Sequence, residues 1–183
     1  GLTTLTRTAL LCNDAALRAN DGHWIVDGDP MEGALVTLGL KAGHDRHRLA
    51  RQMPRIDEIP FDAAHRYMAT LHHSHDGTVF ACVKGAPEQL IDMCACQATA
   101  AGEQPIDRDY WARSVEELAG RGSRVLALAT RPFPGEKRDL AFGDVDPGLT
   151  LHGLVGLIDP PRPEAIAAIA ECQSAGIAVK MIT

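Results

Sequence analysis

Apolar and polar residues along this chain alternate between the spacing of a helix and the spacing of a strand. Helices are predicted where apolar residues recur every three or four positions, and strands where they alternate or form short runs. Asp29 before Pro30 marks one helix start, because an aspartate N-cap and a proline at the first helical position both favour initiation. The predicted helices cover residues 5–19 (interrupted near Asn13), 30–43, 46–53, 87–93, 107–119 and 163–175.

The predicted strands include three that follow one another closely, at residues 55–61, 67–72 and 78–83. Asp76-Gly77 suits a tight hairpin between the last two, and strands joined by such short connections are antiparallel. Further strands are predicted at 23–26, 125–129, 149–158 and 177–183, and loops at 94–105 and 132–148.

The pattern changes after residue 158, where Asp159-Pro160-Pro161 ends the last strand of the first part. A helix and an apolar strand follow, which is the repeating unit of a parallel α/β sheet. One such unit cannot bury both faces of its strand, so residues 159–183 are assigned to an incomplete second domain and residues 1–158 to the first. The predicted class is α+β: a mostly antiparallel sheet flanked by helices, with a C-terminal helix-strand unit from a parallel α/β domain.

Composition narrows the classes of function. The 183 residues are 45% hydrophobic and 23% charged, with a net charge of -6, and this acidic balance argues against a nucleic-acid partner. No apolar stretch approaches the ~20 residues of a membrane span, and no signal peptide is visible. The five cysteines are scattered and odd in number, which is typical of reduced thiols in a cytosolic setting. We expect a monomer.

Common catalytic and phosphate-binding motifs are missing: the chain has no Walker A loop, no Gly-x-Gly-x-x-Gly, no Gly-x-Ser-x-Gly and no His-Glu-x-x-His. Cys94-Ala95-Cys96 lacks the second pair of a zinc site. A cluster of histidines carries no matching ligand pattern, so we expect a solvated turn and no metal site; its members are His65, His72, His73 and His75.

Six segments, in order along the chain, resemble signatures of one family. They are Asp29-Pro30-Met31-Glu32-Gly33-Ala34-Leu35, Glu58-Ile59-Pro60-Phe61 with Met68, Val83-Lys84-Gly85-Ala86-Pro87-Glu88, Gly122 to Ala129, Asp159-Pro160-Pro161-Arg162, and Ile177 to Thr183. The stretch Leu11 to Ala15 also fits. On these segments, which span nearly the whole chain, it resembles the nucleotide-binding domain of P-type cation-transporting ATPases, in the calcium, sodium/potassium and magnesium pump branch.

The resemblance implies a nucleotide site. Phe61 would stack on the adenine ring, Lys84 would attract the nucleotide from the floor of the pocket, and Arg124 would hold the phosphates or ribose. Glu32 would reach the purine amino edge or orient a neighbour, and Gly85 would allow close approach of the backbone. Relatives carry lysine where this chain has Arg66, and Ala63 and Ala64 are small, so a looser pocket is expected.

Each of these residues also has an ordinary structural interpretation. Phe61 would be a core aromatic, Lys84 a solvated lysine, Glu32 a first-turn carboxylate, and Arg124 a surface residue paired with a carboxylate. By the same resemblance, Asp159, Arg162 and Thr183 lie at the edge of the phosphorylation domain, and the chain holds no catalytic and no metal-binding residue.

The implied function is to bind ATP and position it for phosphoryl transfer to an aspartate outside this chain, with Mg²⁺ in the full-length enzyme and the rest of the pump as partner. The implied location is the cytoplasmic side of an integral membrane protein, in a bacterial inner membrane. Two alternatives stay open. One is a module that keeps the fold without its ligand. The other is a haloacid-dehalogenase-type phosphatase fragment, which needs an Asp-x-Asp nucleophile at a strand end, whereas Asp144-Val145-Asp146 is predicted to lie in a Pro/Gly-rich loop.

Overall fold

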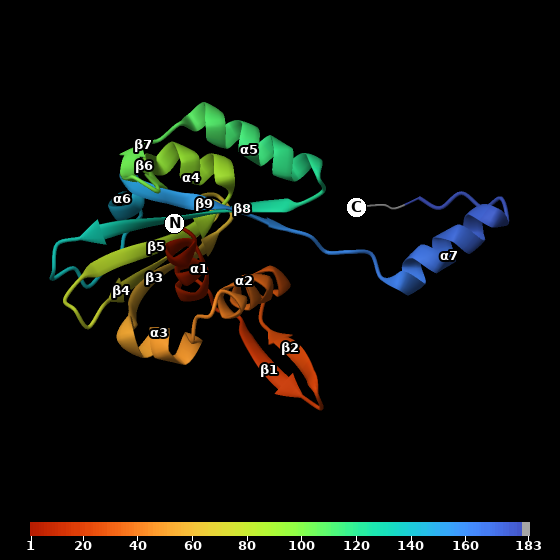
Figure 1. Cartoon of the computed structure of the whole chain (residues 1–183), viewed down its shortest axis with the longest axis horizontal. Helices are drawn as coiled ribbons and strands as arrows, with labels where there is room; N and C mark the ends of the chain where they lie inside the picture. The colour runs from red at the N-terminus through yellow and green to blue at the C-terminus, as the bar shows by residue number, and fades with distance from the viewer. Residues whose placement is uncertain (181–183) are drawn as a thin grey trace.

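A seven-stranded sheet forms the body of the computed structural model, which describes residues 1–180 (Figure 1). Every neighbouring pair is antiparallel except β6 and β9, which run parallel. In spatial order the strands are β3 (Arg55–Asp62), β4 (Tyr67–His73), β5 (Val79–Gly85), β8 (Arg124–Phe133), β9 (Leu149–Leu157), β6 (Cys94–Thr99) and β7 (Gly102–Pro105). The predicted mostly antiparallel α+β class is confirmed.

Helices cover both faces of this sheet (Figure 1). On one face lie α1 (Leu2–Leu11), α2 (Pro30–Lys41) and α3 (Arg46–Gln52), and on the other lie α4 (Pro87–Met93) and α5 (Arg108–Gly120). Successive residues of a strand point to opposite faces, so Met68 packs with α1 to α3 while Ala69 packs with α4. The central strands β4 and β5 are therefore buried along almost their whole length.

The segment after α1 differs from the prediction. Helix was expected to residue 19, but α1 ends at Leu11, and β1 (Ala16–Asn20) and β2 (His23–Asp27) form a two-stranded hairpin. Asn13 ends the helix, because its side chain donates to Ala9 O and accepts from Ala15 N, which holds the chain in a turn. The hairpin packs on α2 at Gly33, where an added Cβ would lie 2.5 Å from Val26.

Two predicted loops contain regular structure. Residues 94–105 form β6 and β7, because β6 pairs in parallel with β9, a partner some fifty residues later in the chain, and antiparallel with β7. In the stretch 132–148, β8 continues to Phe133 and a short helix, α6 (Phe142–Val145), follows.

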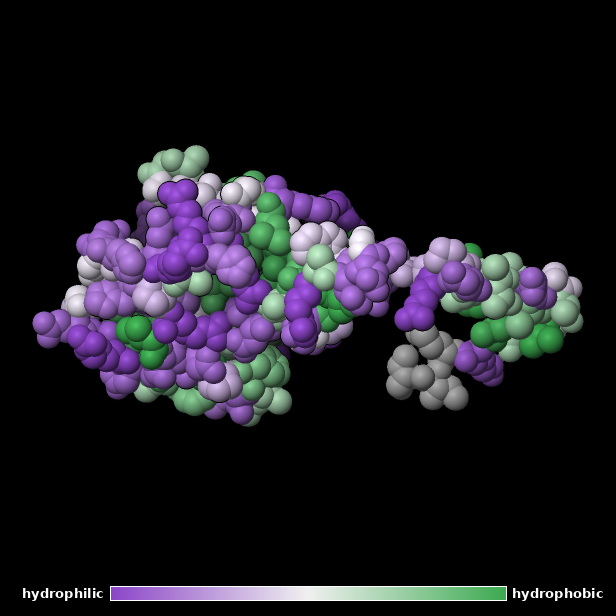
Figure 2. Space-filling model, turned by 90° about the horizontal axis from the view of Figure 1, so that it is seen from below, coloured by the Kyte–Doolittle hydropathy of each residue, from purple (hydrophilic) through white to green (hydrophobic). Residues whose placement is uncertain are grey.

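The C-terminal part stands away from the sheet (Figure 1). Helix α7 (Pro163–Ser174) has no buried residue, and Ile166 and Ile169 are 56% and 43% exposed. Figure 2 shows apolar surface on this projecting part of the chain. The predicted strand at 177–183 is wrong for residues 177–180, which form no strand, and Thr183 lies outside the described residues. The division into two domains stays a prediction. Among the described residues, no helix is long and apolar enough to cross a membrane.

Candidate nucleotide site at one end of the sheet

The antiparallel order gathers four strand ends at one end of the sheet. β3 and β5 finish there, and β4 and β8 begin there, because neighbouring strands run in opposite directions. This places Phe61, Arg66, Lys84 and Arg124 at the same end although they span more than sixty positions of sequence. Helix α2 lies over the same region and contributes Glu32.

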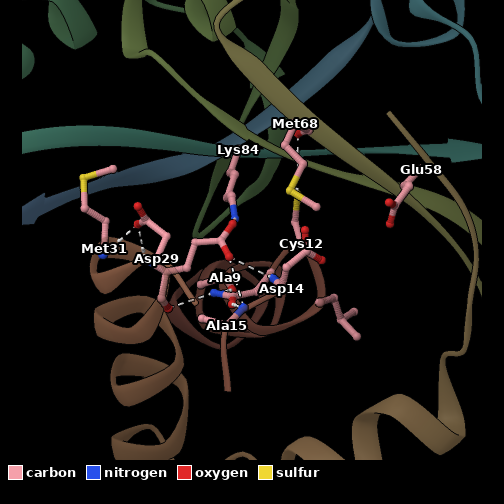
Figure 3. Close-up of polar contacts among 12 residues, drawn as sticks. Ala9, Cys12, Asp14, Ala15, Asp29, Met31, Glu58, Met68 and Lys84 are labelled. Atoms are coloured by element: carbon pink, nitrogen blue, oxygen red, sulfur yellow. Dashed lines mark hydrogen bonds and ion pairs between the residues drawn. The ribbon is translucent and has the colours of Figure 1, made fainter. Parts of the chain in front are cut away.

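Lys84 is the most enclosed cation of this group. Its side chain is 9% exposed and forms an ion pair with Glu32, whose side chain is 16% exposed (Figure 3). The two groups come from different elements, β5 and the first turn of α2. Asp29 sets that first turn by accepting hydrogen bonds from Met31 N (2.8 Å) and Glu32 N (3.2 Å). Lys84 is therefore not the solvated lysine of the structural interpretation.

The Glu32 carboxylate is held from its other side by the loop that follows α1. Its Oε2 accepts hydrogen bonds from the backbone N–H groups of Asp14 and Ala15, each at 3.0 Å. Asn13 adds a bond from Nδ2 to Glu32 O at 2.9 Å. Glu32 thus orients a neighbour, Lys84, and joins α2, β5 and the loop, which is more than a simple first-turn carboxylate does.

The sequence did not indicate that the loop after α1, or the two arginines Arg46 and Arg55 that bind its carbonyl groups, would take part in holding Glu32 and Lys84. Arg46 donates to Ala15 O, and Arg55 donates to the carbonyls of Leu11 and Asn13. The sequence signal that could have indicated this loop was the stretch Leu11 to Ala15, which resembled the family's sequence but had been given no role in the site. Nothing in the spacing indicated that β3 would supply an arginine to it.

Phe61 is an exposed aromatic ring at the end of β3, with 65% of its surface accessible, so the core interpretation is wrong. Ile59 pairs with Ala69 and Asp62 with Tyr67, which puts Phe61 at the level of Met68 on the neighbouring strand. Met68 in turn pairs with Lys84. Because neighbouring strands lie about 4.8 Å apart, the backbones of Phe61 and Lys84 are separated by roughly 10 Å, with β4 between them.

Arg66 and Gly85 meet at the turn that enters β4. Arg66 has a positive φ of 58°, and its Nη1 lies 2.7 Å from Oε1 of the exposed Glu88. A Cβ on Gly85 would lie 2.6 Å from Arg66 O and 2.6 Å from Tyr67 Cβ. The lack of a side chain at Gly85 is therefore required by the neighbouring strand, whether or not a ligand approaches.

Arg124 begins β8 and is exposed. β5 ends where Gly85 pairs with Ala127, so Arg124 lies three residues beyond the last β5 partner. Among the ion pairs of residues 1–180 it has no partner, which removes the paired-surface interpretation. Asp159 and Arg162 are exposed in the segment leading to α7, which leaves the sheet at this same end, because Leu157 at the end of β9 pairs with Arg124 (Figure 1).

The expected solvated cluster of histidines is wrong for His72, which is 2% exposed. It lies on the face of β4 that carries Thr70 and hydrogen-bonds with Thr70 Oγ1 (2.8 Å) and Met53 O (3.0 Å). Burial lowers its pKa to about 4. His65 belongs to a different turn, where it stacks on Phe142 with ring centroids 4.1 Å apart.

Metal-binding and thiol chemistry find little support in the described part of the chain. Within residues 1–180, no group of three or more His, Cys, Asp or Glu side chains is arranged to hold a metal ion. The five cysteines are free, and burial raises the pKa of Cys94 to about 12. Asp144 lies in α6 with Lys137 Nζ at 2.8 Å, not at the strand end that a dehalogenase-type nucleophile occupies.

Two hollows lie away from Phe61 and Lys84, and the first borders the loop arrangement through Asn13, Arg46 and Arg55. One, of about 100 Å³, is lined by residues of α1, α3 and the start of β3, at the opposite end of that strand from Phe61. The other, of about 490 Å³, lies beside the β4–β5 hairpin.

Comparison with known proteins decides the family. Residues 1–164 match the family model described as P-type ATPase, cytoplasmic domain N. The chain belongs to the P-type ATPase family. It is 45% identical over 177 residues to the cation-transporting ATPase pma1 of Synechocystis, which covers 96% of this chain and 19% of that protein.

Other P-type ATPases are similar over almost the same span. Identity is 36% to the calcium-transporting ATPase of Bacillus subtilis, over 94% of this chain and 20% of that protein. It is 33% to the sodium/potassium-transporting ATPase subunit alpha-2 of Bos taurus, over 99% of this chain and 19% of that protein. The chain thus spans about a fifth of the length of the curated relatives that it matches.

Proposed function

We propose that this chain is the ATP-binding domain of a cation-transporting P-type ATPase, and that it positions ATP for phosphoryl transfer to an aspartate outside the residues given. The observation that carries the proposal is an exposed aromatic ring, Phe61, separated only by β4 from the buried Lys84 in a member of this family. The Phe61 ring is 65% exposed, so one of its faces is accessible to a planar base.

The proposed site divides the nucleotide between two regions. Phe61 stacks on the adenine, an interaction worth about 1–3 kcal/mol per base. Lys84 and Arg124 attract the phosphates and ribose, since both cations lie at the same end of the sheet. Arg66 contributes positive charge at the rim, where it pairs with the exposed Glu88.

Glu32 sets the position of Lys84 in this proposal. Its carboxylate already accepts two backbone hydrogen bonds and an ion pair, so its task is to hold the ammonium group in place. A preorganised cation loses less entropy on binding than a mobile one. The domain therefore contributes orientation and charge, which dominate phosphoryl-transfer catalysis.

The same proposal makes this chain part of a complete pump that transports a cation and whose membrane helices lie in a bacterial inner membrane. It also makes the domain a monomer. Magnesium would neutralise phosphate charge in the full-length enzyme, and we assign no residue of this chain to it. Residues 159–183, with Asp159, Arg162 and Thr183, are proposed as the edge of the phosphorylation domain. The family match ends at residue 164, close to that boundary.

A titration of ATP into the isotope-labelled chain without magnesium tests the proposal, with backbone amide shifts as the readout. Saturable shifts are expected around Phe61, Lys84 and Arg124. Phe61→Ala should weaken binding about 5- to 150-fold, the equivalent of the stacking energy. The matched control is Trp24→Ala on β2, another aromatic residue that is 72% exposed, and it should leave affinity unchanged.

Two results would overturn the proposal. If millimolar ATP gives no saturable shifts, the module has kept the fold without its ligand. If Phe61→Ala and Trp24→Ala bind ATP equally well, the base does not stack on Phe61.

A further inference from the structure

Arg55 joins the edge of the sheet to the loop that holds Glu32. Its Nη1 lies 2.7 Å from Asp14 Oδ1 and 2.6 Å from Glu58 Oε2. Its Nη2 donates to Asn13 O at 2.8 Å and to Leu11 O at 3.2 Å. One guanidinium therefore binds two carboxylates and two backbone carbonyls.

The strand that carries Arg55 needs such an anchor. β3 is the first strand of the sheet, so only β4 pairs with it, and that pairing is interrupted by two register shifts. An edge strand with an irregular ladder is held less firmly than a central one. Arg55 lies at the start of β3 and Phe61 near its end.

The loop of residues 12–15, which the Arg55 guanidinium contacts, is also held in place by side chains. Residues 12–15 belong to no helix or strand, yet the N–H groups of Asp14 and Ala15 fix the Glu32 carboxylate. Figure 3 shows Asp14 and Ala15 close to the carboxylate that contacts Lys84, and Glu58 beyond Asp14 on the other side. Arg55 thus lies between the loop that positions Lys84 and the strand that positions Phe61.

We propose that Arg55 is a positioning residue for nucleotide binding, which sets the spacing between the Phe61 ring and the Lys84 ammonium group. The inference rests on the proposed function. Arg55 lies six positions before Phe61 on β3, about 20 Å away in an extended strand, so it does not reach a base stacked on that ring. It acts through the loop and β3, and loss of its bonds lets the two move relative to each other.

The chemistry of the side chain supports arginine in particular. Burial opposes the charge of Arg55, but the hydrogen bonds that it donates to the Asp14 and Glu58 carboxylates outweigh burial and raise the pKa of the guanidinium. The fork geometry allows several acceptors to be bound at once in fixed directions. A lysine has a single ammonium on a flexible stem and cannot hold four acceptors in that arrangement.

The test compares Arg55→Met and Arg55→Lys with the wild-type chain in the ATP titration. The signals of the Asp14 and Ala15 amides and of the Lys84 ammonium group are recorded before ATP is added. Arg55→Met is expected to weaken ATP binding about tenfold, within the range of couplings in shared networks. Arg55→Lys should lose nearly as much, and in both variants the Lys84 signal should move without ligand.

Two controls separate position from stability. Arg18→Met removes an arginine from an exposed ion pair with Asp27 on the hairpin, and it should change neither affinity nor the Lys84 signal. Val79→Ala creates a cavity at the far end of β5, where the side chain is 1% exposed. It should lower the melting temperature and leave ATP affinity unchanged.

Should Arg55→Met fail to fold, Asp14→Ala replaces it, since that carboxylate is 58% exposed and its loss removes only one of the four acceptors. A two- to fivefold weakening is then expected, at the lower end of the same range of couplings. Folded Arg55 or Asp14 variants that bind ATP as the wild type does would overturn the inference and leave the proposed function standing. A wild-type chain that does not bind ATP would overturn both.

Discussion

Removal of either partner of the Glu32–Lys84 pair should destabilise the fold, but by unequal amounts. In Glu32→Ala, Lys84 keeps its charge with its side chain 9% exposed and loses its carboxylate. The N–H groups of Asp14 and Ala15 lose their acceptor as well. Stranding a buried charge costs about 3–5 kcal/mol, so we expect a loss of about that size.

In Lys84→Met the carboxylate loses its ion pair but keeps two backbone donors, and methionine fills the space of the lysine stem. That loss should be about 1.5–3 kcal/mol, the cost of a charge-assisted hydrogen bond. The double variant leaves no stranded cation, so it should be more stable than Glu32→Ala alone.

Urea unfolding at pH 7, followed by circular dichroism, measures these differences as changes in the free energy of unfolding. Arg18→Met serves as the matched control, because its partner Asp27 is 57% exposed and such pairs contribute about 1 kcal/mol or less. A Lys84→Met variant less stable than Glu32→Ala would refute the reasoning, because it would show that the carboxylate, not the ammonium group, is the costly group to leave behind.

Two further predictions concern acid stability and backbone contact. His72 has a pKa lowered to about 4 by burial, against about 6.5 in the unfolded chain, so the unfolded state takes up the proton first as pH falls. The free energy of unfolding should therefore fall by up to about 3 kcal/mol between about pH 6.5 and 4. Urea unfolding of His72→Gln should show a smaller fall over the same range, and a pH dependence identical to that of the wild type would contradict the prediction. Gly85→Ala should lose about 1–3 kcal/mol in thermal unfolding, because its Cβ would lie 2.6 Å from the Arg66 carbonyl oxygen. Gly120→Ala in α5 is the control, because its Cβ meets open space, and this variant should gain about 0.5–1 kcal/mol of unfolding free energy. Equal changes in the two variants would contradict the prediction, because they would show that the contact at Gly85 is relieved at no cost.

Local signals in the sequence predicted most of the elements. The Asp29-Pro30 start of α2 and the Pro87 start of α4 follow from capping and from the fixed φ of proline, which depend on near neighbours. The β3–β4–β5 meander follows from short connections between apolar runs. Six ordered motifs were also enough to indicate the family, and the comparison confirmed it.

Elements that depend on distant partners were not predictable in the same way. β6 is a strand because β9 lies beside it, and its short run of mainly Cys and Ala residues gave no strand pattern. The helix expected through residue 19 ended at Leu11, because Asn13 bonds within the turn. His72 was taken for a turn residue, but α3 and the sheet enclose it.

The candidate site shows the same division. The resemblance to the family's motifs pointed to Phe61 and Lys84, while only the folded chain decided that Lys84 is held by Glu32 and that Arg55 ties β3 to the loop. Motifs record which side chains are present, because they are read along the chain. Ion pairs between elements depend on strand order and register, which long-range packing sets.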